Sequence, residues 1–301
     1  MLAAHNRRRL IAGFAAIYLV WGSSYLASRI GVQRLPPLLF AGVRFTCAGL
    51  VMLGVAHLLR QRVRPAGREW RDLMVLALCA FVVSNGLSIW ALQWLPSNQV
   101  ALLNVSAPLW IVLLGSLGSR GHRPGPRETI GLLLGFIGTA LVIRRAGGSA
   151  FAGSFVPQAA VLLACIAWAV STIYLRNVAP RLPVQGLIGW QMLLGGIGLV
   201  AAGVARGEAA LWHWSWTGML ALIYLTVFAS CLAHTAYAWL ALRVSPTSLG
   251  TYAYVNPLIA TLLGWWVLQE SLTPLQLTGM PIVLGSVLLI NWPFRARGAR
   301  A

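Results

Sequence analysis

The sequence contains the same set of residues twice. Trp21, Ser24, Arg29, Arg34, Leu35, Pro36, Gly42 and Gly49 recur 147 positions later as Trp168, Ser171, Arg176, Arg181, Leu182, Pro183, Gly189 and Gly196. Proline pairs continue the match toward the C-terminus, Pro96 with Pro246 and Pro108 with Pro257. Because an ungapped match of this length indicates internal duplication, we expect two copies of one structural unit.

The composition indicates the medium in which these copies fold. Of the 301 residues, 58% are hydrophobic and only 9% are charged, which is too apolar for a soluble domain. Apolar stretches of about 20 residues, enough to cross a bilayer core of about 30 Å as a helix, occur ten times. The predicted fold is an all-α membrane protein in the lipid bilayer, with ten transmembrane helices near residues 10–30, 37–59, 73–93, 97–118, 129–145, 156–176, 185–205, 216–242, 247–269 and 275–294.

Each copy contains five of these segments, an odd number. The second copy therefore crosses the membrane in the opposite direction, which predicts two inverted five-helix repeats, residues 1–146 and 156–301, joined by a periplasmic linker at 147–155. In transporters built from inverted repeats, the substrate site lies near the bilayer midplane between the halves. The pattern thus predicts a transporter that works by alternating access on a small-molecule substrate.

The arginines indicate the orientation of the chain. All 23 basic residues are Arg, and 17 of them fall on the cytoplasmic side if the N-terminus is cytoplasmic. By the positive-inside rule we therefore expect both termini in the cytoplasm. A formal net charge of +18 would suggest a nucleic-acid partner in a soluble protein, but in short loops between apolar helices it indicates topology instead. No nucleic-acid partner is expected.

Polar and aromatic side chains inside the expected helices suggest where the substrate binds. Such groups are costly in lipid unless they face protein or water, and several follow one helix face, as Tyr18, Trp21, Tyr25 and Ser28 do. The candidate substrate-binding residues are Tyr18, Trp21, Tyr25, Phe81, Ser84, Asn85, Ser88, Asn104, Trp168, Thr172, His234, Tyr237, Tyr252 and Asn256. Together they predict an aromatic, uncharged cavity. The alternative is that these groups only form hydrogen bonds between helices, at about 0.6 kcal/mol each.

Two kinds of residue keep more than one interpretation. Pro108 and Pro257 occupy equivalent places in the fourth and ninth segments and are candidate hinges, although prolines also simply end helices. Arg44 lies about seven residues, or roughly 10 Å, into the second segment. It either binds a substrate carboxylate or snorkels outward in a structural role, which is the favoured interpretation. Its repeat partner is the neutral Gln191.

The acidic residues bear on energy coupling. Glu69, Asp72, Glu128 and Glu208 are expected in loops and Glu270 at the outer end of the ninth segment, so no carboxylate occupies the midplane. This favours facilitated efflux or exchange, with a proton-coupled efflux carrier for drugs or other metabolites as the alternative. The sequence contains no catalytic motif, carboxylate dyad or metal-binding cluster. No enzymatic activity, metal or cofactor is therefore expected, and a membrane enzyme or scaffold is the remaining alternative.

Two stretches carry a family resemblance. Residues 245–264 followed by 269–279, and their first-half counterparts Trp21–Tyr25 and Leu35–Phe45, resemble the EamA-type carriers of the drug/metabolite transporter superfamily. The resemblance implies two inverted EamA repeats in the bacterial inner membrane and, as in the YddG-like exporters, export of amino acids or related small metabolites. Because the internal repeat supplies both halves in one chain, we expect a monomer or weak homodimer. Many members carry an acidic residue after the fourth helix as well. Arg120 and Gly121 stand there in this sequence, so a symmetric role for Glu270 is not expected.

Overall fold

The computed structural model describes residues 2–117, 125–143, 155–178, 182–241, 243–244 and 252–291. Apart from short turns these residues are helical, and none of them forms a strand. Among these residues, seven helical segments are long and apolar enough to cross a membrane, and the helices near 255–268 and 274–289 are apolar but shorter. The all-α membrane character is thereby confirmed. Residues 147–154 of the predicted linker and the site of Pro246 lie outside the described residues.

The helices follow the predicted segments closely. In the first half they are α1 (Leu2–Val32), α2 (Pro37–Leu58), α3 (Glu69–Ala77), the π-helix η1 (Leu78–Asn85), α4 (Gly86–Ala91), α5 (Ser97–Asn104), α6 (Ala107–Ser116) and α7 (Pro126–Ile143). In the second half they are α8 (Phe155–Val178), α9 (Val184–Ala205), the 3-10 helix η2 (Glu208–Leu211), α10 (Trp216–Tyr224), the π-helix η3 (Leu225–Leu232), α11 (Ala233–Ala241), α13 (Tyr252–Leu268) and α14 (Pro274–Asn291).

Prolines and acidic residues explain where several helices begin. α2 starts at Pro37, because a proline in the first turn needs no backbone N–H partner. α9 starts directly after Pro183, its N-cap residue. α3 starts at Glu69, four residues before the predicted position, with Glu69 and Asp72 in its first turn. Carboxylates there stabilise the positive end of the helix dipole. The prediction that these two residues lie in a loop was therefore wrong. It was also wrong for Glu128, in the first turn of α7, and for Glu208, in the 3-10 helix η2.

Three predicted helices are interrupted. The 97–118 segment divides into α5 and α6, with a break at Val105 and Ser106, because Pro108 lacks an N–H and its ring clashes with the carbonyl four residues earlier. The third and eighth segments contain the π-helices η1 and η3, which begin 147 residues apart, the spacing of the sequence repeat. π-helical turns are rare and frequently lie at functional sites.

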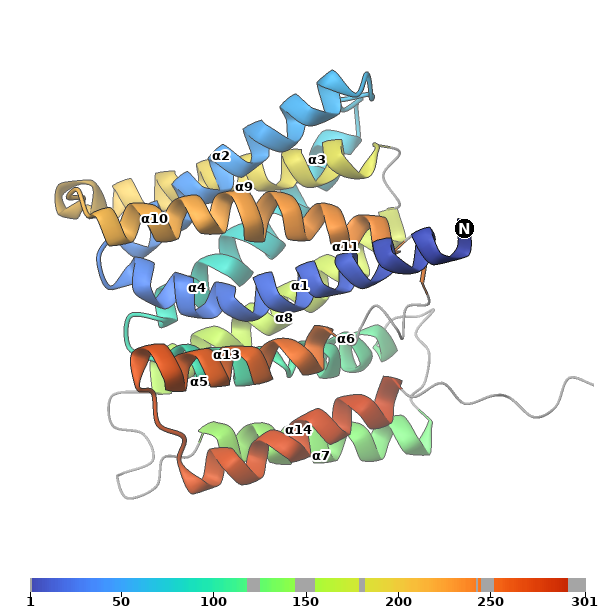
Figure 1. Ribbon diagram of the computed structural model, residues 1–301, viewed down its shortest axis with the longest axis vertical. Helices are drawn as coiled ribbons and strands as arrows, with labels where there is room; N and C mark the ends of the chain where they lie inside the picture. The colour runs from blue at the N-terminus through green and yellow to red at the C-terminus, as the bar shows by residue number, and fades with distance from the viewer. Residues whose placement is uncertain are drawn as a thin grey trace, which may run out of the picture.

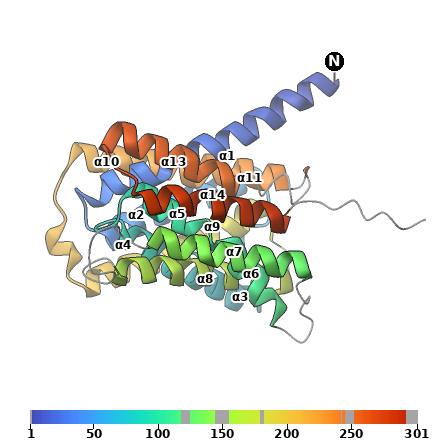
Figure 2. The ribbon, with the colours of Figure 1, turned by 90° about the horizontal axis from the view of Figure 1, so that it is seen from below.

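The helices lie side by side across the bundle (Figure 1). α2 and α9 pair near one end, α7 and α14 pair at the other, and α1, α8, α13, α5 and α6 lie between them (Figure 1). α1 and α8 enter the bundle from opposite sides, α1 from the right in Figure 1 and α8 from the left. The N-terminal part of α1 projects beyond the other helices, as Figure 2 shows from below. The centre of the bundle is therefore formed by the helices between the two outer pairs, which include α1, α8 and α13 (Figure 1).

The repeated glycines bring α2 and α9 into backbone contact. A Cβ atom at Gly42 would lie 2.6 Å from the nitrogen of Val200, and one at Gly49 would lie 2.8 Å from the oxygen of Gly189. In return, a Cβ atom at Gly196 would lie 2.9 Å from the oxygen of Gly42. Small residues are what allow membrane helices to approach this closely. The sequence repeat thus corresponds to a helix pair with reciprocal contacts.

Candidate functional site

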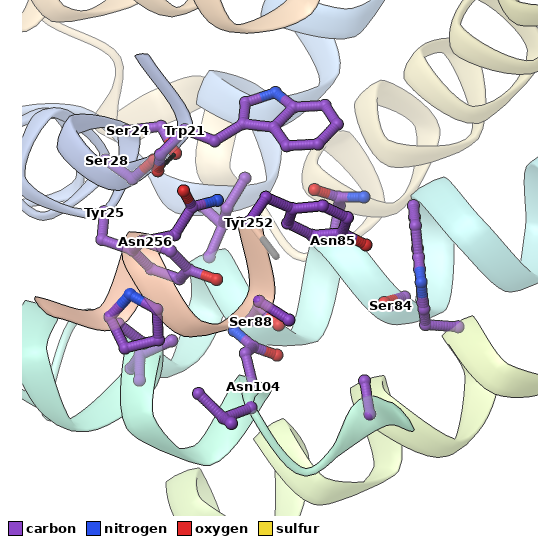
Figure 3. A pocket seen from close by; sticks show the side chains of 18 of the residues that line it. Trp21, Ser24, Tyr25, Ser28, Ser84, Asn85, Ser88, Asn104, Tyr252 and Asn256 are labelled. Atoms are coloured by element: carbon purple, nitrogen blue, oxygen red, sulfur yellow. Dashed lines mark hydrogen bonds between the residues drawn. The ribbon is translucent and has the colours of Figure 1, made fainter. Parts of the chain in front are cut away.

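A cavity of about 230 Å³ lies between helices of both halves of the chain. Figure 3 shows side chains of α1 and α13 on one side of it and side chains of η1, α4 and α5 facing them. Ten of the predicted residues line this cavity, as do both candidate hinge prolines: Trp21, Tyr25, Ser84, Asn85, Ser88, Asn104, Trp168, His234, Tyr252, Asn256, Pro108 and Pro257. The structure thus brings together residues that are up to 236 positions apart in the sequence.

The other four predicted residues do not line the cavity. Phe81 is buried against Phe45, with ring centroids 5.0 Å apart. Tyr18 packs against Phe14, and Tyr237 lies beside Trp21 without lining the cavity itself. The Thr172 hydroxyl donates to the backbone oxygen of Trp168 at 2.9 Å. The predicted helix faces were wider than the cavity, so the residues at their edges contact neighbouring helices instead.

Trp21 is the centre of an aromatic cluster in the cavity wall. Its ring centroid lies 5.1 Å from His234 and 5.3 Å from Tyr252, both edge-to-face, a preferred aromatic arrangement. Its Nε1 donates to the backbone oxygen of Ala229 at 3.1 Å, and Nδ1 of His234 lies 2.9 Å from the same oxygen. Ala229 belongs to η3. The π-helix therefore positions two of the aromatic groups that face the cavity.

Amide side chains provide the polar part of the wall. Nδ2 of Asn85 donates to the backbone oxygen of Ala80 at 2.7 Å, and Oδ1 of Asn104 lies 3.4 Å from the Cys165 thiol. In the orientation that satisfies its neighbours, the amide nitrogen of Asn256 donates to the backbone oxygens of Tyr18 and Tyr252, at 3.3 Å each. Each amide is fixed by the protein on one side. The wall is thus a preorganised set of neutral polar groups between aromatic rings.

Pro257 affects the cavity through the backbone of α13. It lies inside the helix, where a proline provides no N–H for the carbonyl four residues earlier. That carbonyl belongs to Ala253, which also lines the cavity. An interruption of this kind both exposes a backbone acceptor and weakens the helix at the site.

The prediction of an uncharged cavity was wrong, because Arg44 of α2 lines it. Arg44 is only 7% exposed, and its Nε donates to Oγ of Ser230 at 3.0 Å. The cavity wall formed by the described residues contains no Asp or Glu. Counting residues along α2 gave the depth of Arg44 in the helix but not the direction of its side chain.

Glu270 lies away from the cavity, at the start of α5. Its carboxylate accepts hydrogen bonds from the Ser97 nitrogen at 2.7 Å, the Ser97 hydroxyl at 2.9 Å and the Asn98 nitrogen at 3.0 Å. A carboxylate at a helix N-terminus satisfies N–H groups that have no partner within the helix. Glu270 therefore ties the end of α13 to the helix that contributes Asn104.

Sequence reasoning also missed part of the wall. Ser24 and Ser28 line the cavity but were not among the candidate substrate-binding residues. Ser24 follows Trp21 by three positions and therefore lies on the same helix face, and Ser28 lies on the predicted face of Tyr18, Trp21 and Tyr25. The remaining lining residues are small or aliphatic: Ile89, Leu92, Val100, Ala101, Val105, Ala107, Ile111 and Ala253. They carry no sequence signal, because apolar residues occupy every face of a membrane helix.

A metal site is not evident in the part of the chain that the structure describes. There, no three residues of the types His, Cys, Asp and Glu are grouped so that they could hold a metal ion. The groups around the cavity can bind a small molecule through ring stacking, hydrogen bonds and the Arg44 charge.

Comparisons with known proteins identify transporters as the relatives of this chain. The sequence model of the EamA-like transporter family matches twice, over residues 9–144 and 158–292. The inner membrane transporter YedA of Escherichia coli K12, described as uncharacterized, is 32% identical in sequence. The match covers 94% of this chain and 90% of the YedA chain. The uncharacterized transporter YvbV of Bacillus subtilis is 26% identical in sequence, and the match covers 98% of this chain and 95% of the YvbV chain.

A solved structure supports the fold. Its chain is 25% identical and superposes with a TM-score of 0.66, covering 94% of this chain and 96% of that one. Since the family model matches most of the sequence in two copies, the chain belongs to the EamA-like transporter family and is a membrane transporter.

Proposed function

We propose that this transporter exports amino acids or related small metabolites from the cytoplasm by alternating access. The observation that carries the proposal is the cavity of about 230 Å³ with aromatic and amide groups in its wall. Sites for drug-sized ligands usually measure about 300–1,000 Å³, so this cavity fits a smaller molecule. Aromatic rings suit an apolar side chain, and the amides suit the polar groups of an amino acid.

We infer two inverted five-helix repeats, 1–146 and 156–301. The double match of one family model supports this division, as do the two π-helices at the repeat spacing of 147 residues. The opposite directions of α1 and α8 (Figure 1) and the reciprocal glycine contacts of α2 and α9 fit an inversion. The inner membrane location rests on the relative YedA, and the cytoplasmic termini rest on the arginine distribution.

The transport step is facilitated or proceeds by exchange. No carboxylate of the described residues lines the cavity, and carboxylate chains are a common means of moving protons in membrane transporters. The competing function is proton-coupled efflux of drugs or other metabolites, in which His234, the histidine of the cavity wall, would be the group to carry the proton.

Counterflow in proteoliposomes tests the proposal. Vesicles are loaded with each of the standard amino acids, and uptake of the same radiolabelled compound is measured with and without an imposed pH gradient, with protein-free vesicles as the control. We expect accumulation of at least one amino acid without a gradient. Failure to carry any amino acid would refute the proposed substrate class, and an absolute need for the pH gradient would refute the coupling.

The topology and oligomeric state have their own tests. A fluorescent protein fused to the C-terminus should fluoresce in cells, whereas alkaline phosphatase fused there should be inactive, if both termini are cytoplasmic. Cross-linking in native membranes should give mainly monomer, with at most a minor dimer band. The opposite fusion result would overturn the orientation.

A further inference from the structure

We propose that Arg44 is the anchor for a substrate carboxylate, with Ser230 as the residue that positions it. This inference rests on the proposed function and names the chemical group that the cavity selects. Arg44 belongs to α2, and its side chain forms part of the cavity wall together with Trp21, Asn85 and His234. A guanidinium group at such a site faces whatever fills the cavity.

The Arg44 guanidinium forms a hydrogen bond to the protein through Nε, and its two terminal nitrogens are available for a ligand. Its Nε donates to Oγ of Ser230 at 3.0 Å, and its central carbon lies 4.6 Å from the centre of the Phe45 ring. Within the described part of the chain, Nε is the Arg44 nitrogen that donates a hydrogen bond, and neither terminal nitrogen donates one. The two Nη groups therefore retain their donors, in the fork arrangement that matches the two oxygens of a carboxylate.

Among the described residues, no carboxylate forms an ion pair with Arg44. Arg62 with Glu69 and Arg71 with Asp72 are ion pairs of that part of the chain, and neither involves Arg44. Arg44 is 93% buried. A buried and unpaired charge is costly and usually neutralised by a partner. An anionic group that enters the cavity can therefore form the ion pair with Arg44 that the described residues do not provide.

The repeat shows that the fold does not require this charge. At the position equivalent to Arg44, α9 carries Gln191, which is 8% exposed. Both residues occupy corresponding places on two helices that pack closely on each other. A neutral amide thus fits at this place in the second copy, and the cation in the first copy is available for binding.

The arrangement predicts discrimination between an acid and its amide. An amino acid and its carboxamide have nearly the same size and apolar part, but the amide lacks the negative oxygens for Arg44. In the counterflow assay each amino acid that is carried is therefore compared with its carboxamide, and with its N-acetyl derivative, which keeps the carboxylate but lacks the positive charge. We expect the amide to be carried at least tenfold more slowly than the acid.

Variants locate this discrimination at Arg44. Arg44→Gln, which copies the residue at 191, should reduce the ratio of acid to amide transport to near one, and Ser230→Ala should reduce it partly. Arg44→Lys keeps the charge without the fork and should retain an intermediate ratio. The matched control is Arg29→Gln, because Arg29 is a half-buried arginine of α1 that donates to the Leu92 backbone and does not line the cavity. Its ratio should equal that of the wild type.

The outcomes separate this inference from the proposed function. Amides and acids carried equally well by the wild type would overturn the role of Arg44 while leaving amino-acid transport intact. An unchanged ratio in Arg44→Gln would do the same. If Arg44→Gln does not reach the membrane in folded form, the wild-type comparison and the Ser230→Ala and Arg44→Lys ratios decide the matter. If no amino acid is carried at all, the proposed function fails first.

Discussion

The indole nitrogen of Trp21 donates a hydrogen bond to the backbone oxygen of Ala229, 3.1 Å away in the π-helix η3. The two residues are 208 positions apart and belong to different halves of the chain. A π-helix replaces bonds to the fourth residue with bonds to the fifth, so its oxygens are offset from those of an α-helix. The orientation of the Trp21 ring is therefore linked to the irregular backbone of η3.

Replacing Trp21 by Ala should reduce counterflow of the best-carried amino acid at least tenfold. The change removes the edge-to-face contacts with His234 and Tyr252 and one hydrogen bond to Ala229. The amount of folded protein, measured by size-exclusion chromatography, should remain sufficient for the assay. The matched control is Trp216→Ala, since Trp216 is 72% exposed and does not line the cavity. Normal transport by both Trp21→Ala and Trp168→Ala would refute the placement of the site.

Replacing Pro257 by Ala should slow turnover several-fold with little change in substrate affinity. Alanine restores an N–H that can bond the Ala253 carbonyl, so α13 becomes a continuous and stiffer helix. The maximal rate and the half-saturation concentration are measured separately in proteoliposomes. Pro281→Ala is the control, because Pro281 lies inside α14 and does not line the cavity. Equal effects of the two substitutions would remove the case for a hinge at Pro257.

Replacing Glu270 by Gln should lower the melting temperature of the purified protein. The carboxylate accepts three hydrogen bonds from Ser97 and Asn98, and hydrogen bonds to charged groups contribute about 1.5–3 kcal/mol each. Gln keeps one acceptor but loses the charge at the N-terminus of α5. The neighbouring Gln269→Ala is the control, since exposed Gln269 bonds only within its own segment and should change stability by less than about 0.5 kcal/mol. An unchanged melting temperature for Glu270→Gln would show that the cap contributes nothing.

Replacing Gly49 by Ala should reduce the yield of folded protein, whereas Gly54→Ala should not. A Cβ atom at Gly49 would lie 2.8 Å from the Gly189 oxygen, so α2 and α9 would have to separate. At Gly54, on the same helix, nothing lies within 4 Å of the added atom. Fluorescence-detected size exclusion of both variants in one detergent compares them directly. Equal yields would mean that the two helices can move apart without cost.

The fold could be predicted well where one residue type determines a boundary. Pro36 and Pro183 preceded helices that begin within one residue of the predicted start. The π-helices could not be predicted, because apolar membrane segments have the same composition whether the backbone bonds to the fourth or the fifth residue. The break at Val105 and Ser106 was foreseeable as an effect of Pro108, although one continuous segment was predicted there.

The lining of the candidate site could be predicted where a polar or aromatic residue is unusual in lipid. Trp21, Asn104 and His234 stand out in apolar segments for this reason, and all three line the cavity. The argument fails for Phe81, because a phenylalanine can line a cavity or pack against another apolar side chain, and Phe81 packs against Phe45. Arg44 shows another limit, because the direction of a long side chain depends on the hydroxyl of Ser230, 186 positions away.

The glycine contacts of α2 and α9 also restrict how the protein can move. Gly42 and Gly49 face Gly196 and Gly189 with backbone against backbone, so a shift of one turn along the axis would drive side chains into main-chain atoms. These contacts therefore oppose sliding at this pair. In the proposed alternating-access cycle the pair would act as a fulcrum, and the cavity would open to either side of the membrane by tilting of the helices around it.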